Sequence, residues 1–362
     1  MRDGRRILDA DAHVIEPGGL FGAAQQPDVE PMVLPEHTPR VPVGDLDKLA
    51  DFLADGCSAT EYLRCMDAEG IDGVVLYPSV GLFVPFQHDL APGLSIEACR
   101  AYNDWVAQYC ATAPHRLAAV GIVPLVDVEA AAAEARRVHQ LGLVGVMVRP
   151  NHCYGRDLGS PAYYHLYDVL EELGLVLAVH EGLGLRGTTI GDHRSDKFAV
   201  RHAMSHPMEQ MAAMASLVLE GTLERHSTLN VAFLESGTGW LPYWLARLDG
   251  HAEWMADSET KSLSLTPSEY FQRQCVICTD PDDPLAASVV DRVGADHVMW
   301  ASDFPHPDAV YPHAVSEFLA ESDEHGLEGA DLDAVLWDTP LRFYGLEERF
   351  SGVGAATPTP PG

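Results

Sequence analysis

The sequence alternates short apolar runs with helix-like segments from about residue 7 to residue 306. The runs have the length and the Val, Ile and Leu content of buried strands, and the segments between them carry apolar residues at helical spacing. Strands that alternate with helices form a parallel sheet, because each helix returns the chain to the starting edge. Eight such units predict an α/β fold, a distorted (β/α)₈ barrel of the TIM type rather than an open sheet. The expected strands are residues 7–13, 74–78, 117–125, 145–150, 175–182, 230–235, 274–279 and 297–306.

The length of the chain fits one barrel domain. A single-domain barrel can use most of 362 residues, of which 47% are hydrophobic and 21% are charged. We therefore expect one domain over residues 1–350. Residues 18–60 form a long loop after the first strand, which is expected to be a lid or a binding loop, with disorder as the alternative. The Pro-rich tail at 351–362 is expected to be disordered.

Acidic residues outnumber basic ones by 54 to 23, which gives a formal net charge of −31. Such a surface repels nucleic-acid phosphates and anionic lipids, so we expect neither nucleic-acid nor membrane partners. No apolar run approaches the roughly twenty residues that a membrane helix needs. The basic residues at 2–6 lead into the first strand and not into a signal-peptide core. The sequence therefore predicts a cytoplasmic protein with a small-molecule substrate, and it leaves the oligomeric state open.

Seven cysteines are scattered along the chain, at positions 57, 65, 99, 110, 153, 275 and 278. An odd, dispersed set in a long chain is typical of free thiols in a reducing compartment. Cys275 and Cys278 form a CxxC pattern, but residues three apart on a strand face opposite ways. We therefore interpret this pair as core packing and not as a redox or zinc motif.

Polar side chains stand at the ends of several expected strands: Asp11 and His13 after the first, His180 after the fifth, Glu235 after the sixth and Asp303 after the eighth. Residues i and i+2 of a strand face the same way, so Asp11 and His13 point into one space. The carboxyl ends of barrel strands meet at one mouth, where the chemistry of such barrels takes place. Burying all these groups there would be costly unless they were paired, neutralised or bound to a cation. A divalent metal site is therefore predicted; the alternative is that Asp11 and His13 hydrogen-bond to each other.

Two further histidines, His202 and His206, precede a helix expected at residues 207–219. Proline suits the first position of a helix, and it disfavours helical backbone angles in the residue before it. We therefore expect that His202 and His206 do not form a helical i, i+4 pair of ligands.

Four motifs give the chain a resemblance to a known superfamily. They are Asp-Ala-His at 11–13, Val-His at 179–180, Leu-Glu-Ser-Gly-Thr-Gly-Trp-Leu-Pro at 234–242 and Ala-Ser-Asp-Phe-Pro-His at 301–306. In this combination the chain resembles the amidohydrolase superfamily over residues 7–347, in particular the amidohydrolase-related branch that includes aminocarboxymuconate-semialdehyde decarboxylase. The resemblance implies a distorted (β/α)₈ barrel. It also implies that Asp11, His13, His180 and Asp303 are ligands of one divalent metal.

Three positions depart from the pattern of that superfamily. Asp11 stands where members often have the first histidine of His-x-His. Glu235 stands where many members carry a histidine that moves protons or binds a second metal. The fourth strand ends in Arg149 instead of the lysine that, when carbamylated, bridges two metals in binuclear hydrolases. A hydrolytic or decarboxylating function thus loses a customary proton carrier, although Glu235 or His306 can replace it.

The mouth carries more carboxylates and imidazoles than one metal needs, which favours a two-metal hypothesis. The surplus groups are Glu16, His202, His206, Glu235 and His306. Such ligands suit iron or manganese, and carboxylates can bridge two ions; the alternative is that they hydrogen-bond to the metal ligands. The chain is similar to the small diiron monooxygenase subset of platensimycin-type biosynthesis. That similarity implies two iron ions, hydroxylation of an apolar, natural-product-like substrate and an electron donor.

A mononuclear hydrolase or decarboxylase is the alternative hypothesis. In it, the four ligands that the resemblance implies hold one Zn²⁺ or Mn²⁺, a bound water is activated, and Asp303 or Glu235 moves the proton. The substrate would then be a small carboxylic acid or a lactone. In either hypothesis the catalytic residues are expected among Glu235, Asp303 and His306. A third hypothesis, a non-catalytic binding barrel, leaves the polar groups at the mouth unexplained.

Overall fold

The structure is a computed structural model of the chain, and it describes residues 2, 4–24, 52–83, 86–87, 90–182, 189–191, 194–306 and 309–352. Its strands run parallel to their neighbours in two sheets, with the orders β1-β2-β3 and β4-β5-β6-β7-β8-β9. Every strand is buried along its whole length, which explains its nearly continuous apolar sequence. The strands are β1 (Leu8–Val14), β2 (Gly73–Pro78), β3 (Leu117–Ala119), β4 (Gly121–Ile122), β5 (Gly145–Val148), β6 (Val176–His180), β7 (Val231–Leu234), β8 (Cys275–Thr279) and β9 (Val298–Trp300).

Hydrogen bonds join the two sheets at both of their edges. Strands β3 and β4 are one segment interrupted at Val120, whose N–H donates to the carbonyl of Leu76 on β2 (3.0 Å). On the other side, the N–H of Asp303 donates to the carbonyl of Asp11 (3.0 Å), and the N–H of His13 donates to the carbonyl of Phe304 (2.6 Å). The eight strand segments therefore follow one another in a ring that is distorted at two seams. The predicted parallel α/β fold of the TIM-barrel type is confirmed.

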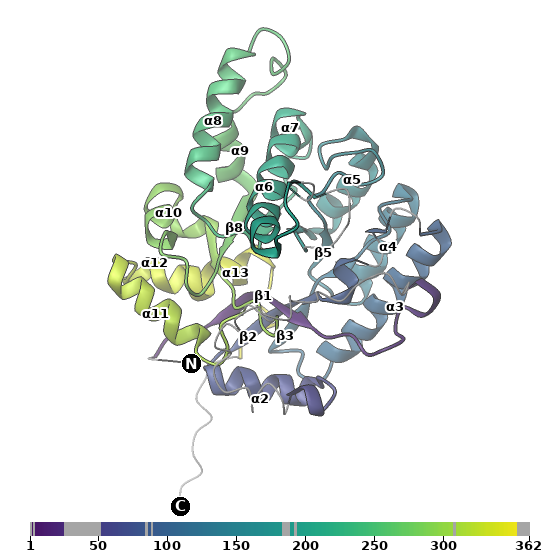
Figure 1. The fold of residues 1–362 in the computed structure, drawn as a ribbon, viewed down its shortest axis with the longest axis vertical. Coiled ribbons are helices and arrows are strands. Elements are labelled where there is room, and N and C mark those ends of the chain that lie inside the picture. Colours follow the sequence, from purple (N-terminus) through teal and green to yellow (C-terminus); the bar gives the residue numbers. More distant parts are fainter. Residues whose placement is uncertain are drawn as a thin grey trace, which may run out of the picture.

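Helices surround the strands on the outside, and α8 projects from the body of the molecule (Figure 1). Short 3-10 turns lie at η1 (Gly22–Ala24), η2 (Val80–Leu82), η4 (Pro161–Tyr163) and η5 (Ala295–His297), and a π-helical turn lies at η6 (Ala334–Asp338). The larger helices alternate with strands in the way that the sequence predicts. The helices are α2 (Ala59–Glu69), α3 (Pro92–Cys110), α4 (Val128–Gln140), α5 (Tyr164–Leu173), α6 (Phe198–Leu219), α7 (Thr222–Arg225), α8 (Leu241–Trp254), α9 (Pro267–Gln274), α10 (Ala286–Val293), α11 (Ala314–His325), α12 (Gly329–Asp333) and α13 (Thr339–Phe343).

Local capping groups fix where several helices begin and end. The side chain of Ser58 accepts a hydrogen bond from the N–H of Glu61 at the start of α2, and Asp127 does the same for the N–H of Ala130 in α4. Helix α2 ends at Gly70 with φ of 81°, a left-handed angle that glycine adopts without strain. These capping signals are local in sequence.

Helix α6 differs from the prediction for its part of the chain. It begins at Phe198, and Pro207 lies inside it and not at its first position. A proline in a helix interior costs about 3 kcal/mol. In the turns before it, the rings of Phe198 and His202 stack with centroids 5.2 Å apart, and the rings of His202 and His206 lie tilted with centroids 4.8 Å apart. The prediction that His202 and His206 are not a helical i, i+4 pair is therefore wrong.

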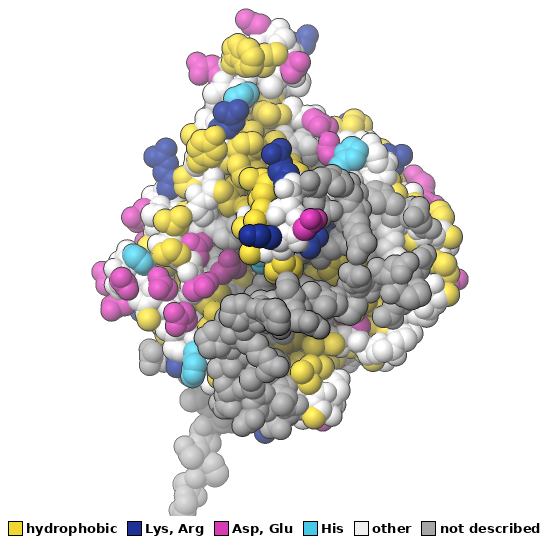
Figure 2. Space-filling model, in the orientation of Figure 1, with side chains coloured by type: hydrophobic (Ala, Val, Ile, Leu, Met, Phe, Trp, Pro, Cys, Tyr) yellow, Lys and Arg dark blue, Asp and Glu magenta, His cyan; other side chains and the backbone are white. Residues whose placement is uncertain are grey.

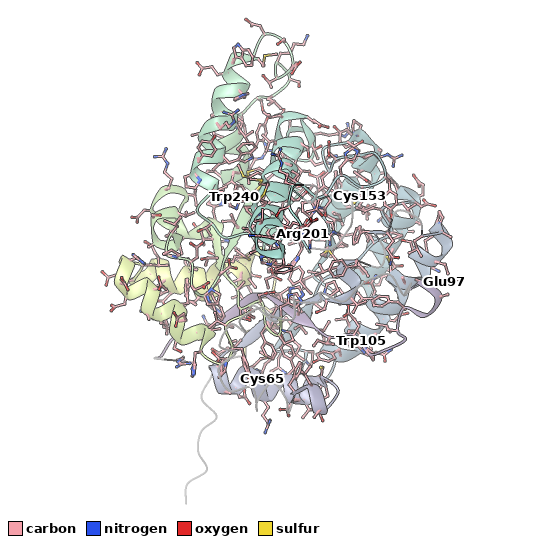
Figure 3. All side chains as sticks on the ribbon, in the orientation of Figure 1. Cys65, Glu97, Trp105, Cys153, Arg201 and Trp240 are labelled. Atoms are coloured by element: carbon pink, nitrogen blue, oxygen red, sulfur yellow. The ribbon has the colours of Figure 1, made fainter. Side chains whose placement is uncertain are left out.

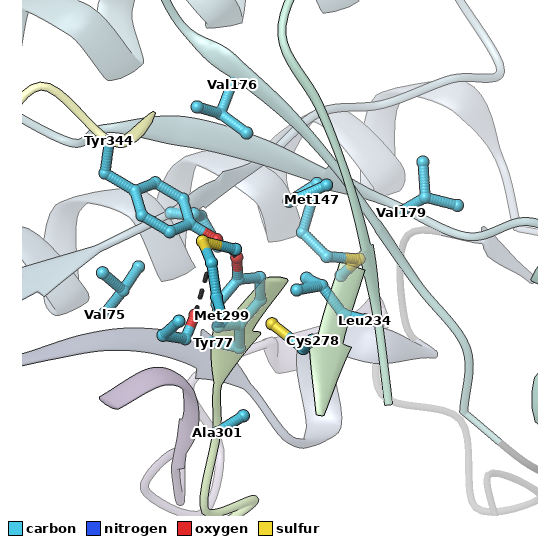
Figure 4. Packing of buried hydrophobic residues seen from close by; sticks show 14 of the residues in the cluster. Val75, Tyr77, Met147, Val176, Val179, Leu234, Cys278, Met299, Ala301 and Tyr344 are labelled. Atoms are coloured by element: carbon cyan, nitrogen blue, oxygen red, sulfur yellow. Dashed lines mark hydrogen bonds between the residues drawn. The ribbon is translucent and has the colours of Figure 1, made fainter. Parts of the chain in front are cut away.

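The interior between strands and helices is filled by side chains, as Figure 3 shows, with Cys65 of α2 and Trp105 of α3 on the side of the three-stranded sheet. At the centre, the hydroxyl groups of Tyr77 and Tyr344 form a hydrogen bond of 2.6 Å. Figure 4 shows this pair among apolar side chains that include Cys278. All seven cysteines are buried free thiols, so the interpretation of the CxxC pair as core packing is confirmed.

The surface reflects the acidic composition, with Asp and Glu side chains gathered over α11 and α12 (Figure 2). Across the described ranges, no helix combines the length and the apolar character needed to cross a lipid bilayer. Most of the loop predicted at 18–60, namely residues 25–51, lies outside the described residues, as do residues 353–362 of the predicted tail. The part of that loop which is described contains η1 and the start of α2.

Candidate metal centre

Strand β1 brings Asp11 and His13 to one place at its carboxyl end, as their i, i+2 spacing predicts. Both side chains are buried, and Nε2 of His13 lies 3.6 Å from Oδ1 of Asp11. The last residue of β6, His180, reaches the same place from the other sheet, and its Nε2 lies 3.3 Å from Oδ2 of Asp11. One carboxylate thus stands between two imidazoles.

Backbone carbonyls orient both imidazoles. Nδ1 of His13 lies 2.8 Å from the carbonyl oxygen of Pro78, and Nδ1 of His180 lies 2.6 Å from the carbonyl oxygen of Glu181. A carbonyl can only accept a hydrogen bond, so each Nδ1 carries the proton and each Nε2 presents a lone pair. Metal-binding histidines are commonly oriented in this way.

Among the residues that the structure describes, three buried atoms of this first group that could bind a metal have no hydrogen-bond partner. They are Oδ1 of Asp11, Nε2 of His13 and Nε2 of His180. Leaving a buried polar atom unpaired costs about 1–3 kcal/mol. The three side chains offer ligand atoms within 4.8 Å of one another. A divalent cation that accepts nitrogen and oxygen ligands, such as Zn²⁺ or Mn²⁺, fits these atoms and would satisfy them.

A second set of ligand atoms adjoins the first and shares His13 with it: His13, Glu235, Asp303 and His306 offer atoms within 4.8 Å of one another. Nε2 of His13 lies 3.3 Å from Oδ1 of Asp303, which lies 2.8 Å from Nδ1 of His306. The carboxylate of Glu235 lies 3.5 Å from Nε2 of His180.

The backbone conformation after two strands turns these carboxylates toward the centre. Glu235 follows β7 with φ of 46°, and Asp303 follows β9 with φ of 55°. Left-handed angles in residues other than glycine are strained, and such residues concentrate at functional sites. The sequence prediction placed both residues at strand ends, but strand periodicity gives no information about this turn.

Burial and mutual contact change the ionisation of the cluster. Burial raises the pKa of Asp11 to about 7, and it lowers the pKa of His13 to about 4 and that of His180 to about 3. Burial alone would raise the pKa of Asp303, but the neighbouring His306 and His13 hold it below its ordinary value. Near pH 7 the two imidazoles are therefore neutral and Asp303 is ionised, which are the forms that bind a cation.

His206 also reaches the cluster, while His202 and Glu16 have other surroundings. Nε2 of His206 lies 3.3 Å from Oε1 of Glu235. His202, one turn earlier on α6, lines the cavity beside it. The carboxylate of Glu16 accepts hydrogen bonds from the backbone N–H groups of residues 79, 80 and 81, at 3.3, 2.9 and 2.8 Å. Glu16 thus holds the turn after β2 and is absent from both sets of ligand atoms.

A cavity of about 360 Å³ opens over the cluster. Its walls include His202, His206, Glu235 and Asp303, and also Asp280, which the sequence prediction omitted. Asp280 directly follows β8, so the strand-end rule that identified Glu235 applies to it as well. Burial and the nearby carboxylates of Asp283 and Asp303 raise the pKa of Asp280 well above its ordinary value.

Arg149, at the position of the lysine expected from the resemblance, makes a structural contact instead of a metal bridge. Its guanidinium is fully buried and lies 3.1 Å from the carboxylate of Glu181. It also donates to the side chain of Asn151 (2.8 Å) and to the carbonyl oxygen of Gly182. Because the carbonyl of Glu181 orients His180, Arg149 fixes the segment that carries this imidazole.

Comparisons with known proteins agree with this architecture. The family model described as amidohydrolase matches residues 9–346. A gamma-resorcylate decarboxylase of Rhizobium sp. is 27% identical over 273 residues, which cover 72% of this chain and 80% of that protein.

Solved structures share the fold at low sequence identity. A 5-carboxyvanillate decarboxylase from Sphingomonas paucimobilis superimposes with a TM-score of 0.72 at 22% identity, over 94% of this chain and 99% of that chain. A dihydroxybenzoic acid decarboxylase from Polaromonas sp. JS666, solved with manganese and the inhibitor 2-nitroresorcinol, gives a TM-score of 0.70 at 18% identity, over 95% and 99%. These structures show the shared fold, and the gamma-resorcylate decarboxylase relative agrees better with the decarboxylase hypothesis than with the diiron monooxygenase.

Proposed function

The chain belongs to the amidohydrolase family, and from this premise we propose that it is a metal-dependent decarboxylase of a small hydroxylated aromatic acid. The sequence relative reported above is a gamma-resorcylate decarboxylase, and γ-resorcylate is such an acid. The observation that carries the proposal is the convergence of three buried donor atoms without partners, from Asp11, His13 and His180. One Mn²⁺ or Zn²⁺ ion would be held there, with Asp303 beside it.

The ion, when bound, supplies a Lewis acid that orients and polarises the substrate's oxygen groups. The residues of the chain supply the proton. Decarboxylation of a hydroxybenzoate adds a proton to the ring carbon that bears the carboxylate; the bond to the carboxylate then breaks, CO₂ leaves, and its bonding electrons restore the aromatic ring.

The pair of Asp303 and His306 is placed to deliver that proton. Nδ1 of His306 lies 2.8 Å from the Asp303 carboxylate, and Ser79 holds the other ring nitrogen at 3.2 Å. The His306 ring stacks on the ring of His13 at 3.8 Å between centroids, so it lies beside the proposed metal ligands. The lowered pKa of Asp303 favours its ionised form, which leaves His306 as the proton carrier of the pair.

Turnover without oxygen tests the proposal. Metal-free protein loaded with Mn²⁺ or Zn²⁺ should convert 2,6-dihydroxybenzoate to resorcinol and CO₂ in equal amounts under strict anaerobiosis. His306→Gln should keep the metal but lose most of the rate, about 10²-fold or more for a proton-transfer group. The absence of CO₂ from the metal-loaded protein with this and related hydroxybenzoates would contradict the proposal.

A two-iron monooxygenase with an electron donor is kept as a second candidate because of one observation. The Glu235 carboxylate lies between two imidazoles, 3.5 Å from Nε2 of His180 and 3.3 Å from Nε2 of His206, so there are more donor groups than one ion needs. Protein prepared with iron should then hold about two ions per chain and consume O₂. One ion per chain, with anaerobic turnover, would exclude this candidate.

A further inference from the structure

The turn that follows β2 connects Glu16 with the proposed proton carrier, His306. Glu16 lies two residues after the end of β1 and is buried. Its Oε2 accepts hydrogen bonds from the N–H groups of Ser79 (3.3 Å) and Val80 (2.9 Å), and its Oε1 accepts one from the N–H of Gly81 (2.8 Å). Both oxygens of the side chain therefore hold this turn in place.

The side chain of Ser79 links the turn to His306. Oγ of Ser79 lies 3.2 Å from Nε2 of His306, whose Nδ1 lies 2.8 Å from the carboxylate of Asp303. A hydroxyl group can donate or accept a hydrogen bond, so Ser79 can pair with Nε2 when the ring is neutral and also when the ring is protonated. Such a partner suits a ring that loses and regains a proton during turnover.

The same turn also orients the ring on which His306 stacks. The carbonyl oxygen of Pro78 accepts a hydrogen bond from Nδ1 of His13 (2.8 Å). The rings of His13 and His306 stack with centroids 3.8 Å apart and an angle of 28° between their planes. Two supports of the His306 ring, the Ser79 hydroxyl and the His13 ring, thus depend on this turn, so a shift of the turn would move the ring.

We propose that Glu16 is a positioning residue for His306: it holds the turn at 78–81, and the hydroxyl of Ser79 on that turn fixes the imidazole beside Asp303. This inference rests on the proposed function, in which His306 carries the proton, and it adds Glu16 and Ser79 to the residues on which the reaction depends. The role requires acceptor oxygens and not a net charge, so it does not depend on the pKa of Glu16, which burial raises.

Glu16→Gln and Ser79→Ala test the two links separately. Glutamine keeps the volume but places an N–H donor against at least one of the backbone N–H groups, and alanine removes the hydroxyl. With Mn²⁺-loaded protein and 2,6-dihydroxybenzoate, each variant should lower kcat by about tenfold, the value of one net hydrogen bond, and leave KM within about twofold. Ser79→Thr keeps a hydroxyl and should retain most of the rate.

The double variant Glu16→Gln/Ser79→Ala tests whether Glu16 acts through Ser79. If it does, the double variant should be no slower than Ser79→Ala alone, because the link to His306 is already broken. Losses that multiply to about a hundredfold would show two independent effects and would overturn the inference.

Glu69→Gln is the matched control. Glu69 is likewise buried, and its carboxylate accepts hydrogen bonds from the backbone N–H groups of His313 (2.7 Å) and Val315 (3.3 Å) at the start of α11. It belongs neither to the two sets of ligand atoms nor to the walls of the cavity above them. Glu69→Gln should therefore lose stability but keep kcat. A loss of kcat equal to that of Glu16→Gln would show a general effect of stability and would overturn the inference.

NMR of the metal-free protein, labelled with ¹⁵N in histidine, gives a measurement that does not depend on turnover. The ¹⁵N chemical shift of Nε2 reports hydrogen bonding at that nitrogen, and His306→Gln identifies the signal of His306. Glu16→Gln and Ser79→Ala should displace this signal in the same direction, and Glu69→Gln should leave it unchanged. If Glu16→Gln does not fold, Glu16→Asp, whose carboxylate is one methylene further from the turn, replaces it.

The outcomes distinguish this inference from the proposed function. Displaced Nε2 signals in a protein that releases no CO₂ would support the positioning role and contradict the decarboxylase. An unchanged Nε2 signal in the Glu16 variant would overturn the inference, and CO₂ release by the wild type would then leave the proposed function standing. An unchanged kcat in both Glu16→Gln and Ser79→Ala would overturn the inference as well.

Discussion

Oδ2 of Asp11 and Nε2 of His180 lie 3.3 Å apart in the interior, although β1 and β6 belong to different sheets. Each side chain also presents a buried atom without a hydrogen-bond partner. Two such groups remain close only if something else compensates for their lost hydration. A bound metal ion would provide that compensation.

Removing either group should abolish metal binding and leave the fold intact. Asp11→Asn and His180→Ala each weaken or delete a ligand, so metal analysis after dialysis should fall from about one ion per chain to near zero. Circular dichroism should remain that of the wild type. His251→Ala, which removes a histidine of α8 that lies outside the cluster, is the control and should keep its metal. Full metal content in both site variants would contradict the proposed centre.

The metal-free protein should lose stability as the pH rises from about 6.5 to about 8. Burial raises the pKa of Asp11 to about 7 and that of Asp9 to about 8, so both carboxyls ionise at lower pH in the unfolded chain. The unfolded state then binds fewer protons, and the free energy of unfolding decreases with pH. The lowered pKa values of His13 and His180 make the free energy of unfolding increase with pH instead. They do so only below pH 6.5, the ordinary pKa of histidine.

Mn²⁺ or Zn²⁺ should oppose this loss, because the ion binds Asp11 in its ionised form. The apparent metal affinity should therefore rise with pH up to about 7 and then level. Thermal unfolding with and without a chelator across this pH range measures the stability of the metal-free protein and the stabilisation by the ion. Calorimetry in two buffers gives the number of protons released when the metal binds. Asp11→Asn should remove the Asp11 share of the pH dependence of the metal-free protein and leave that of Asp9. An affinity that stays constant through this range would argue against Asp11 as a ligand.

Glu235→Gln should distinguish the one-metal and two-metal hypotheses. In the proposed mononuclear enzyme the variant keeps its ion, because Asp11, His13 and His180 are unchanged, and only turnover slows. In a two-iron enzyme it loses one ion per chain and all oxygen uptake. Iron, zinc and manganese analysis combined with an oxygen electrode decides between them. His206→Gln, which removes the histidine 3.3 Å from Glu235, serves as a companion variant and should behave in the same way.

Breaking the buried ion pair of Arg149 and Glu181 should destabilise the protein strongly. Arg149→Met leaves the Glu181 carboxylate buried without its cation, and a loss of about 3–5 kcal/mol in the free energy of unfolding is expected. The double variant Arg149→Met/Glu181→Leu should recover part of that loss, since no unpaired charge remains. Chemical denaturation measures both. Equal stability of the single variant and the wild type would show that the pair does not act as a buried ion pair.

Glu16→Ala should lower stability without changing metal content. The Glu16 carboxylate accepts three backbone hydrogen bonds in the turn after β2, and the loss of their acceptor should cost about 1–3 kcal/mol. Gly81 allows this close approach, because a Cβ there would lie 3.1 Å from the carboxylate. Chemical denaturation measures the loss of stability, and metal analysis measures the metal content. Loss of metal with unchanged stability would restore Glu16 as a candidate ligand.

The sequence predicted the parts of the site that follow from strand geometry. Asp11 and His13 share a face because strands have a period of two, and His180 and Asp303 converge with them because parallel strands end at one mouth. The surroundings of Glu16 depend on backbone N–H groups more than sixty residues away, which no local pattern contains. Asp280 also directly follows a strand, so the same reasoning applies to it, but the predicted site residues did not include it.

The start of α6 could not be predicted from the proline signal alone. Pro207 favours the first helical position, but ring stacking of Phe198 and His202 stabilises the helix before it. This contact joins residues four apart on one helix, and it favours helical backbone ahead of the proline. The left-handed angles of Glu235 and Asp303 are likewise set by the surrounding structure and not by residue type.

The hydrogen bonds that join Asp303 to Asp11 and His13 to Phe304 have a consequence for how the protein matures. Asp11 and His13 stand on the first strand segment and Asp303, beside the proposed ion, follows the last, so a nascent chain cannot bring these groups together until β9 has left the ribosome and met β1. We therefore expect the ion to bind late in folding. Once bound, it would help to hold the first and the last strand segments together.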